Sequence, residues 1–438
     1  AQGFREAQAR STLTRPRAPP PGAAHARGLP TSRPAPPTRR RGPLAMSVAT
    51  QTVAEQREES RRQKWKAMAQ QGIPAFLAEK PEVFRRRARG GVPMEHRWQA
   101  WKAAMRVDSR AEPGKYQQLL QVDNEWTRLI EIDTPRTFPD IPLFDKEHQF
   151  SLLRVLKAFA NLEPAVGYCQ GMNFVAGLLL FVAQNGDFRE SPRLEKEEEA
   201  FWMLTRLMTD GRLSGFYRRH FPLLRRYLWA FDQLAAKHLP ELKAHFAKEG
   251  VQHGVYLHQW FLTLFINCVP MEMVLVFWDA IICGGRGLEI MLPLTVALLQ
   301  AVQDQLLSLP FEDIVRFFKV IRTGDGAHGA MVGGLLVRRC LSIPLTARIG
   351  ERLRAPLPEG EEDACTSPWA SPSQDEDKEF IFSPVKRAEV SQPADDRESL
   401  LGGYLRQLPG VRSWWEDPRG SLHRVRLGSR SEELKRDA

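Results

Sequence analysis

The sequence predicts an all-α fold, and three observations support this prediction. Apolar residues recur with helical spacing in several segments from about residue 50 onward. No convincing apolar and polar alternation bounded by hairpin turns occurs, so the pattern of a half-buried strand is missing from the sequence. The chain has 438 residues, of which 43% are hydrophobic, and this is enough to form a large core. We therefore expect a multi-helix domain with a disordered arm and a disordered tail.

Residues 1–48 are predicted to be a disordered arm rich in Pro and Arg. Residues 1–46 hold nine Arg and one Glu, so +8 of the formal net charge of +10 lies there. This composition buries too little apolar surface to offset the entropy of ordering. The same bias allows an organellar transit peptide, although the Pro clusters oppose the amphipathic helix of such peptides. Because the rest of the chain is nearly neutral, we expect no nucleic-acid partner.

A helical body follows the arm. Residues 50–87 are predicted to be a helical lead-in, residues 88–325 the main domain, and residues 326–352 its helical end. Apolar residues share one helical face in four segments of this body, namely 152–160, 200–208, 274–282 and 311–321. Pro270 precedes the third segment and Gly284 follows it, as expected for the two ends of a helix.

Residues 353–438 are predicted to be a mostly disordered tail with acidic and Ser-Pro character. Ser367, Ser371 and Ser383 each precede Pro, so phosphorylation is conceivable, although such pairs are common in disordered tails. No apolar segment reaches the roughly 20 residues that a membrane-spanning helix needs. The five cysteines are odd in number and widely spaced, which favours a reducing compartment and hence the cytoplasm.

Common catalytic and cofactor motifs do not account for this chain. The sequence contains no GxxxxGK[ST], HExxH or GxSxG motif, so we expect neither a phosphate-binding loop nor hydrolase chemistry. GDGAHG at residues 324–329 follows a helical segment, which argues against a dinucleotide-binding turn. His253 and His258 have no nearby Cys or acidic cluster, so no metal site is expected.

The first polar motif within apolar sequence is LIEIDTPRTFPD, at residues 129–140. Pro135 and Pro139 bracket Arg136 and prevent a continuous helix, so Arg136 is predicted to lie on a rigid, extended turn. The alternative is that Arg136 only forms an ion pair with Asp133.

The second polar motif is GYCQGMN, at residues 167–173. Gly167 and Gly171 allow backbone conformations that are closed to other residues, so Gln170 is predicted to stand where a loop enters a helix. The alternative is that Gln170 and Asn173 merely cap this helix.

Taken together, these segments resemble the TBC domain of Rab GTPase-activating proteins, whose hallmark motifs are IxxDxxR and YxQGMN. The matching residues are Ile130, Asp133 and Arg136, followed by Tyr168, Gln170, Gly171, Met172 and Asn173. Further matching blocks occur in the family's order. They contain Gly91, Val92, Pro93, Arg97 and Trp101, then Trp260 and Phe265, then Pro270, Trp278, Asp279 and Gly284. The resemblance runs from about residue 88 to 325.

The resemblance implies a protein that accelerates GTP hydrolysis by a GTP-bound Rab GTPase and so regulates vesicle traffic. Arg136 would enter the partner's site to neutralise the charge that develops there, and Gln170 would orient the attacking water. Asp133 would orient Arg136 or its loop, and Tyr168 and Asn173 would fix the junction that presents Gln170.

The resemblance also implies that no cofactor belongs to this chain, since GTP and Mg²⁺ would belong to the partner. The chain would supply catalytic groups without being an enzyme itself, and it would reach endomembranes only peripherally, through the GTPase. The alternative function is a non-catalytic helical adaptor that binds a small GTPase or a membrane-tethering partner.

Overall fold

The computed structural model describes residues 47–139, 141, 144–185, 193–321 and 329–357. The chain divides into two compact units, residues 1–56 and 57–438. The first unit contributes only the opening of α1 to the described residues, and all other described elements belong to the second unit. Every regular element of the described residues is a helix, so the predicted all-α fold is confirmed.

The described residues contain seventeen α-helices and five short 3₁₀ helices. The α-helices are α1 (Ser47–Gln71), α2 (Ile73–Glu79), α3 (Pro81–Ala88), α4 (Met94–Met105), α5 (Lys115–Leu120), α6 (Thr127–Asp133), α7 (Lys146–Leu162), α8 (Met172–Asn185), α9 (Arg193–Met208), α10 (Pro222–His238), α11 (Pro240–Glu249), α12 (Leu257–Leu262), α13 (Met271–Cys283), α14 (Met291–Leu306), α15 (Phe311–Val320), α16 (Gly329–Cys340) and α17 (Ala347–Arg354). The 3₁₀ helices are η1 (Val107–Ser109), η2 (Thr134–Arg136), η3 (Leu213–Phe216), η4 (His253–Val255) and η5 (Gly287–Ile290).

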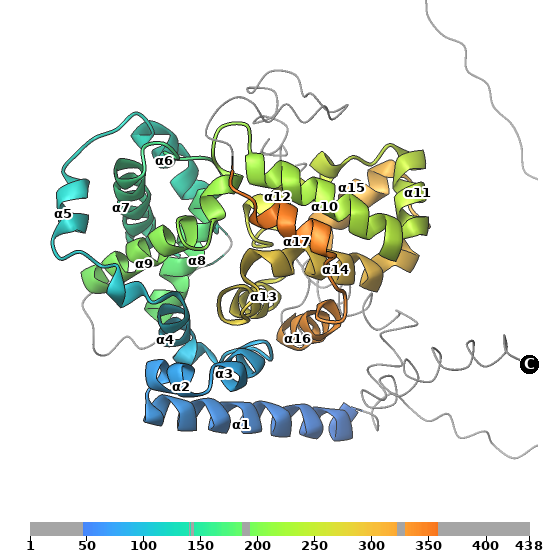
Figure 1. Ribbon diagram of the computed structural model, residues 1–438, viewed down its shortest axis with the longest axis horizontal. Helices are drawn as coiled ribbons and strands as arrows, with labels where there is room; N and C mark the ends of the chain where they lie inside the picture. The colour runs from blue at the N-terminus through green and yellow to red at the C-terminus, as the bar shows by residue number, and fades with distance from the viewer. Residues whose placement is uncertain (1–46, 140, 142–143, 186–192, 322–328, 358–438) are drawn as a thin grey trace, which may run out of the picture. The chain divides into compact units, whose positions relative to one another are not determined.

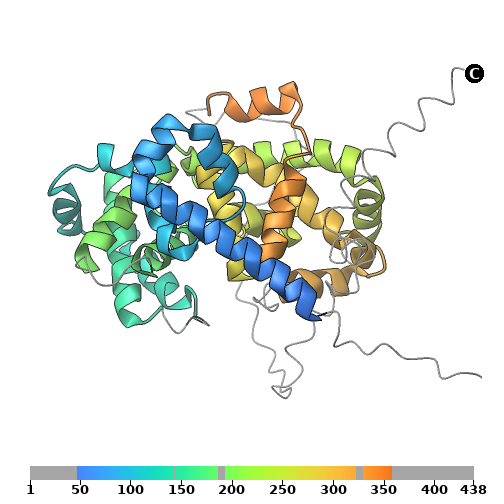
Figure 2. The same cartoon turned by 90° about the horizontal axis from the view of Figure 1, so that it is seen from below.

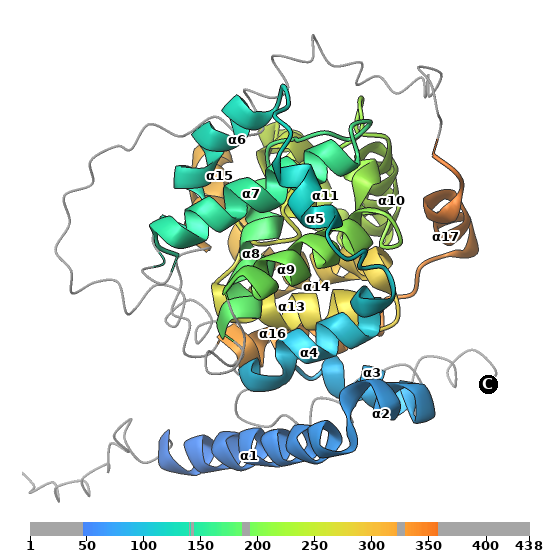
Figure 3. The same ribbon diagram turned by 90° about the vertical axis from the view of Figure 1, so that its left-hand side faces the viewer.

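The helices of the second unit form two groups that α13 and α4 connect (Figure 1). In the first group, α7 packs against α5, α6, α8 and α9. In the second group, α10 packs against α11, α12, α14 and α17, while α16 packs against α13 and α14. Figure 3 views the first group, with α6 beside α7 at its outer side.

Three of the predicted helical segments lie within α7, α9 and α13, and the fourth coincides with α15 except for Ile321, which caps the end of that helix. In α7, the predicted face is buried, since Leu152, Leu156 and Phe159 have no exposed surface. Pro270 and Gly284 flank α13 as predicted. Residues 1–46 of the predicted arm and most of the predicted tail lie outside the described residues. The predicted boundaries were slightly wrong, because α1 already begins at Ser47, within the predicted arm, and α17 extends to Arg354, within the predicted tail.

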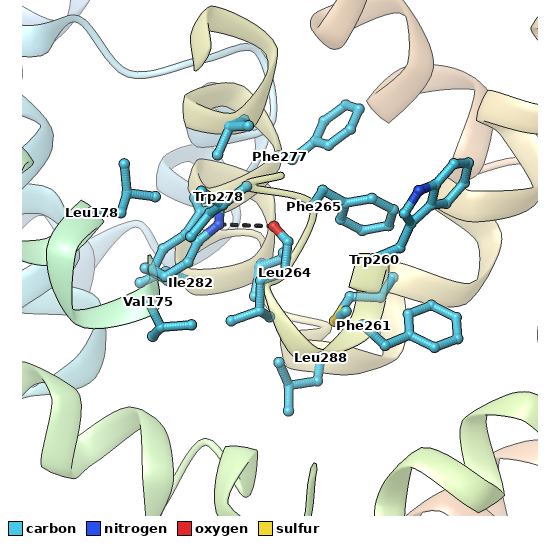
Figure 4. Close-up of a cluster of buried hydrophobic side chains, with 14 of the residues drawn as sticks. Val175, Leu178, Trp260, Phe261, Leu264, Phe265, Phe277, Trp278, Ile282 and Leu288 are labelled. Atoms are coloured by element: carbon cyan, nitrogen blue, oxygen red, sulfur yellow. Dashed lines mark hydrogen bonds between the residues drawn. The ribbon is translucent and has the colours of Figure 1, made fainter. Parts of the chain in front are cut away.

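Aromatic side chains fill the core where the two groups meet. Trp101 stacks on Trp278, with 5.6 Å between the ring centroids. The Trp278 Nε1–H donates to the carbonyl oxygen of Leu264 at 3.0 Å (Figure 4). Leu264 and Phe265 both have positive φ, 48° and 67°, a conformation that is costly for residues other than Gly. The buried indole therefore holds a tightly turned segment after α12.

The described residues add three further observations. None of their helices is long and apolar enough to cross a membrane. They contain no group of three or more His, Cys, Asp or Glu side chains placed to hold a metal ion. Their four cysteines, Cys169, Cys268, Cys283 and Cys340, form no disulfide bond with one another.

Candidate functional site

Arg136 ends the 3₁₀ helix η2, which continues directly from α6. The prediction of an extended turn at Arg136 was wrong, because Pro135 occupies an early position of η2 where its missing N–H is not needed. The chain becomes extended one residue later, at Thr137. The Arg136 side chain is 58% exposed, whereas Ile130 of the same motif is fully buried. The motif thus anchors itself through Ile130 and presents Arg136 to solvent.

Asp133 lies beneath the arginine and is almost completely buried. Its Oδ1 is 3.9 Å from Arg136 Nη1, which is too long for a hydrogen bond. Its Oδ2 accepts a hydrogen bond of 2.8 Å from the Tyr168 hydroxyl. Burial raises the pKa of the Asp133 carboxyl, and the Tyr168 hydrogen bond and the Arg136 charge offset part of this rise. Asp133 therefore holds the turn in place more than it holds the guanidinium.

A second hydrogen-bonded connection joins the two motifs. Asn173 Nδ2 donates to Thr137 Oγ1 at 2.8 Å. The Thr137 hydroxyl in turn donates to the Asp133 carbonyl oxygen at 3.0 Å. Asn173 Oδ1 accepts from the Gly171 backbone N–H at 3.0 Å. All three of these bonds are to buried groups, so they join the turn that ends in Arg136 to the segment that carries Gln170.

Gln170 stands two residues before α8, at the predicted loop-to-helix junction. Its side chain is partly exposed, and its amide makes no hydrogen bond to any other described residue. Gly167 and Gly171 have φ of 59° and 105°. A Cβ on Gly167 would lie 2.3 Å from the Trp126 indole, so only Gly allows this close approach. The junction is rigid while the amide itself remains available.

Met172 completes the second motif as a core residue. It is fully buried, and its sulfur lies 3.3 Å from the Cys169 backbone N–H. The buried residues of the motif therefore fix the junction, while Gln170 is partly exposed to solvent.

The sequence did not single out Thr137 or Trp126, which both support this site. Thr137 follows Arg136 directly, and its position between Pro135 and Pro139 is a local signal of a constrained turn, whereas its burial is evident only in the fold. Trp126 carries no such local signal, because its contact with Gly167 joins residues 41 positions apart.

The other family-block residues form a separate, buried cluster. Asp279 has no exposed surface and accepts hydrogen bonds from the Val92 backbone N–H at 2.7 Å, Arg97 Nε at 3.1 Å and Trp101 Nε1 at 2.8 Å. Arg97 also donates through Nη2 to the Val92 carbonyl oxygen at 2.5 Å. This cluster connects α4 to α13 and does not include Arg136 or Gln170.

The remaining members of these blocks have structural positions. Gly91 has a φ of 93° and Pro93 immediately precedes α4, so both shape the turn into that helix. Trp260 and Trp278 are buried at 2% and 1% exposure, and both belong to the aromatic core. Figure 4 shows Trp260 beside Phe265, on the opposite side of that residue from Trp278.

Comparison with known proteins identifies the class to which this all-α domain belongs as the TBC class of helical domains. The family described as the Rab-GTPase-TBC domain matches residues 94–307. The chain is 32% identical over 311 residues to human Growth hormone-regulated TBC protein 1, covering 67% of this chain and 86% of that protein. The chain therefore belongs to the Rab-GTPase-TBC domain family.

Two further relatives are much longer proteins. The chain is 32% identical over 234 residues to the human Ecotropic viral integration site 5 protein homolog, covering 53% of this chain and 27% of that one. It is 29% identical over 245 residues to Rab GTPase-activating protein eat-17 of Caenorhabditis elegans, covering 56% of this chain and 26% of that one. The chain thus spans about a quarter of the length of these two relatives.

A solved structure confirms the fold. The Chlamydomonas flagellar RabGAP TBC domain superposes with a TM-score of 0.51 at 24% identity, covering 65% of this chain and 95% of that one.

Proposed function

We propose that this protein is a GTPase-activating protein for a Rab-family GTPase and that it supplies Arg136 and Gln170 in trans. Membership of the Rab-GTPase-TBC domain family supports the proposal, as does a relative named Rab GTPase-activating protein. The observation that carries it is the state of Arg136. Its side chain is 58% exposed and its Nη1 is 3.9 Å from Asp133 Oδ1, on a turn that two hydrogen bonds join to the Gln170 segment.

The arginine suits the charge that develops during phosphoryl transfer. GTP hydrolysis spreads negative charge over the transferring phosphoryl oxygens, and an inserted arginine stabilises this charge. A guanidinium is permanently charged and planar, and it offers several donors to phosphate oxygens. Asp133 makes no hydrogen bond to Arg136, and its carboxylate accepts one from Tyr168 instead. Arg136 can therefore move away from the Asp133 carboxylate at little cost in free energy.

The glutamine suits the attacking water. Its carbonyl can accept a hydrogen bond from water, its NH₂ group can donate one, and the side chain stays neutral beside phosphate. The Gln170 amide makes no hydrogen bond to other described residues, so no such bond has to break before it binds a water molecule. A rigid junction places this amide, which limits the entropy lost when it engages a water molecule.

An apolar stripe continues from the arginine along α6. Leu129, Ile132 and Arg136 are spaced at i, i+3 and i+7, which places them on one face of the α6–η2 helical segment. Leu129 and Ile132 are 43% and 45% exposed, although apolar residues of this size usually lie in the core. Exposed apolar side chains beside a functional group are typical of a surface that a partner covers. This stripe therefore fits the docking face for the GTPase.

On this proposal, GTP and Mg²⁺ belong to the partner. The chain acts as an activator without a nucleotide site of its own, and it reaches endomembranes through the GTPase.

The test is a GTP-hydrolysis screen of the full chain against a broad panel of purified, GTP-loaded Rab proteins, with phosphate release as the measurement. We expect stimulation of at least one Rab, and loss of that stimulation in Arg136→Ala and Gln170→Ala. Arg110→Ala removes the same charge from an exposed site outside the motifs and should retain full activity.

Two outcomes of this screen would contradict the proposal. Wild-type protein that stimulates no member of the panel argues against catalysis. A Rab that binds the protein equally well before and after Gln170→Ala, without any stimulation by wild type, identifies the adaptor function instead.

A further inference from the structure

Arginines gather on a different part of the second unit, where the loops that follow α3 and α13 meet. Arg89, at the end of α3, donates through Nε and Nη2 to the Gly284 carbonyl oxygen at 2.9 and 2.5 Å. Arg61 of α1 donates through Nη1 to the Gly90 carbonyl oxygen at 3.1 Å. These contacts bring guanidinium groups from α1 and α3 onto two adjoining loops.

Two more arginines join them. Arg85 lies directly against Gly285, since a Cβ on that glycine would be 2.9 Å from Arg85 Cδ and 3.0 Å from Arg85 Nε. Arg286 follows Gly285 in the chain. We call Arg61, Arg85, Arg89 and Arg286 the arginine cluster.

The glycines of these loops make the close approach possible. Gly91 and Gly285 have φ of 93° and 86°, which favours Gly at both positions. A Cβ on Gly91 would lie 2.7 Å from Arg61 Nη1. The loops are therefore shaped to accept guanidinium groups at contact distance.

Carboxylates neutralise only half of the arginine cluster. Glu58 forms an ion pair with Arg61, and Glu82 forms one with Arg85 at 2.5 Å. Neither Arg89 nor Arg286 forms an ion pair with a carboxylate of the described residues. Gathering like charges costs free energy, and an anion bound among them recovers it.

Two guanidinium nitrogens of the arginine cluster lack an acceptor within the described part of the chain. Arg61 Nε and Arg286 Nη1 are buried and make no hydrogen bond there. A buried N–H of a charged group without an acceptor is costly, and such groups are rare in folded proteins. The hydrogen bonds of Arg89 and of Arg61 Nη1 cap the carbonyl groups that follow α13 and α3. Such capping does not account for Arg61 Nε and Arg286 Nη1.

Cys340, the last residue of α16, is near two members of the cluster. Burial raises the pKa of its thiol to about 12, while the charges of Arg286 and Arg89 act in the opposite direction. The charges of Arg89 and Arg286 therefore both act on the Cys340 thiol, which indicates that the two guanidinium groups lie near each other.

The cluster lies away from the candidate functional site. In Figures 1 and 3, α6 is at the top of the view and α3 is at the bottom. Figure 2 looks onto the lower side, where α3 and α16 face the viewer. A ligand bound at the cluster would leave Arg136 and Gln170 uncovered.

We propose that the arginine cluster binds a phosphate group, either as a free phosphate compound or as the phosphorylated headgroup of a lipid. Guanidinium forks match phosphate oxygens in shape and charge, and a phosphate supplies the negative charge that Arg89 and Arg286 do not receive from the carboxylates of the described residues. This site is separate from the proposed GTPase activation and does not depend on it.

The test uses the full chain and two kinds of probe. Inositol hexakisphosphate, with inorganic phosphate beside it, is titrated by calorimetry to detect a site for free phosphate compounds. Phosphatidylcholine vesicles with and without a phosphorylated inositol lipid are used in a sedimentation assay to detect a lipid site. We expect saturable binding of at least one phosphate probe and none of plain phosphatidylcholine.

The variants Arg286→Gln and Arg61→Gln should each weaken this binding about tenfold or more, because each removes a charged donor. Arg286→Lys, which keeps the charge but loses the fork, should bind less tightly than wild type and more tightly than Arg286→Gln. Arg110→Gln is the matched control with the same charge change at an exposed site and should bind like wild type. The nine arginines of residues 1–46 are common to all variants, so differences report on the cluster.

Binding that Arg110→Gln weakens as much as Arg286→Gln would overturn the proposal, because net charge alone would then explain it. Absence of saturable binding to every phosphate probe would overturn it as well. If a variant folds poorly, the wild-type protein is decisive by itself. A ligand that binds only the folded state raises the unfolding temperature increasingly as its concentration exceeds the dissociation constant, and no rise at saturating inositol hexakisphosphate contradicts the site.

Discussion

Two arginine–aspartate pairs in this protein have opposite environments. Arg97 and Asp279 are both buried, with side chains 8% and 0% exposed, and their hydrogen bond is 3.1 Å long. In the pair of Arg136 and Asp133, only the aspartate is buried, because its side chain is 4% exposed while that of Arg136 is 58% exposed. Arg136 Nη1 lies 3.9 Å from Asp133 Oδ1. A fully desolvated pair must be completely hydrogen-bonded to be tolerated. The second pair leaves its arginine free to act elsewhere.

The two aspartates differ in the same way. Asp279 is surrounded by donors from Val92, Arg97 and Trp101, so its carboxylate is satisfied within the fold. The main partner of Asp133 is Tyr168, which belongs to the other motif. The first aspartate therefore stabilises the junction of α4 and α13, and the second connects the turn that ends in Arg136 to the segment that carries Gln170. Two pairs of the same residue types thus differ in whether the arginine is buried with its aspartate or exposed to solvent.

The largest expected difference between the pairs concerns Arg136. Arg136→Ala should lower stimulation of the responsive Rab by about 10³–10⁵-fold, the range that an arginine finger contributes. Its unfolding temperature should match that of wild type, because the side chain is exposed. Arg136→Lys should also be strongly impaired, since a point charge cannot bridge two phosphate oxygens. Single-turnover phosphate release and thermal unfolding measure the two effects. A destabilised Arg136→Ala protein would show that Arg136 has a structural role like that of Arg97.

Arg97→Ala should give the reverse result. Removing one partner of a buried pair leaves Asp279 uncompensated, so we expect a loss of about 3–5 kcal/mol in the free energy of unfolding. The fraction that stays folded should keep its activity per molecule. Urea denaturation followed by circular dichroism measures the loss. A variant as stable as wild type would show that the buried cluster is not what joins α4 to α13.

Tyr168→Phe should combine both effects at smaller size. It removes the donor to the buried Asp133 carboxylate, and an unsatisfied buried group costs about 1–3 kcal/mol of stability. Because the turn that carries Arg136 loses a connection, stimulation should also fall, though by less than in Arg136→Ala. Combining Tyr168→Phe with Asp133→Asn in a double-mutant cycle checks this. Strictly additive effects would mean that the hydrogen bond does not couple the two motifs.

Ile132→Ser tests whether the apolar stripe beside Arg136 meets the partner. The side chain is 45% exposed, so stability should change by no more than about 0.5 kcal/mol. Loss of an apolar contact at a docking face should raise the GTPase concentration needed for half-maximal stimulation several-fold, with the maximal rate preserved. Met331→Ser, on α16 and 39% exposed, is the matched control. Equal effects of both changes would exclude a specific docking face.

The smallest expected effect is a pH dependence that Asp133 contributes. Burial raises its pKa in the folded protein above the ordinary value, so the folded state holds the proton more tightly than the unfolded state does. The contribution of Asp133 to stability is therefore greatest below the ordinary pKa of about 4 and declines as the pH rises through the folded pKa.

Asp133→Asn cannot ionise and should lack this decline. The unfolding free energy of wild type relative to Asp133→Asn should thus fall as the pH is raised across that window. Asp279 shifts in the same direction, but it is common to both proteins and cancels. Urea titrations of the pair at several pH values measure the difference, and a difference that stays constant or rises with pH would contradict the buried state of Asp133.

The helical segments and the two motifs could be predicted from local sequence. The apolar face of α7, and Pro270 and Gly284 at the ends of α13, are local signals, since helix periodicity and chain-ending residues act within a few positions. Resemblance to a family then picked out Arg136 and Gln170. The conformation at Arg136 was predicted less well, because Pro135 is compatible with both an extended turn and the first turn of a 3₁₀ helix.

The tertiary structure alone decided which polar residues are shielded and which are available. The bonds from Tyr168 to Asp133 and from Asn173 to Thr137 join positions 35 and 36 residues apart, and no local pattern reports such pairs. The arginine cluster likewise combines residues from α1, α3 and the loop after α13. Burial and hydrogen-bond partners arise only when distant segments pack together. The candidate residues could therefore be identified from the sequence, whereas their exposure and their partners were determined by the fold.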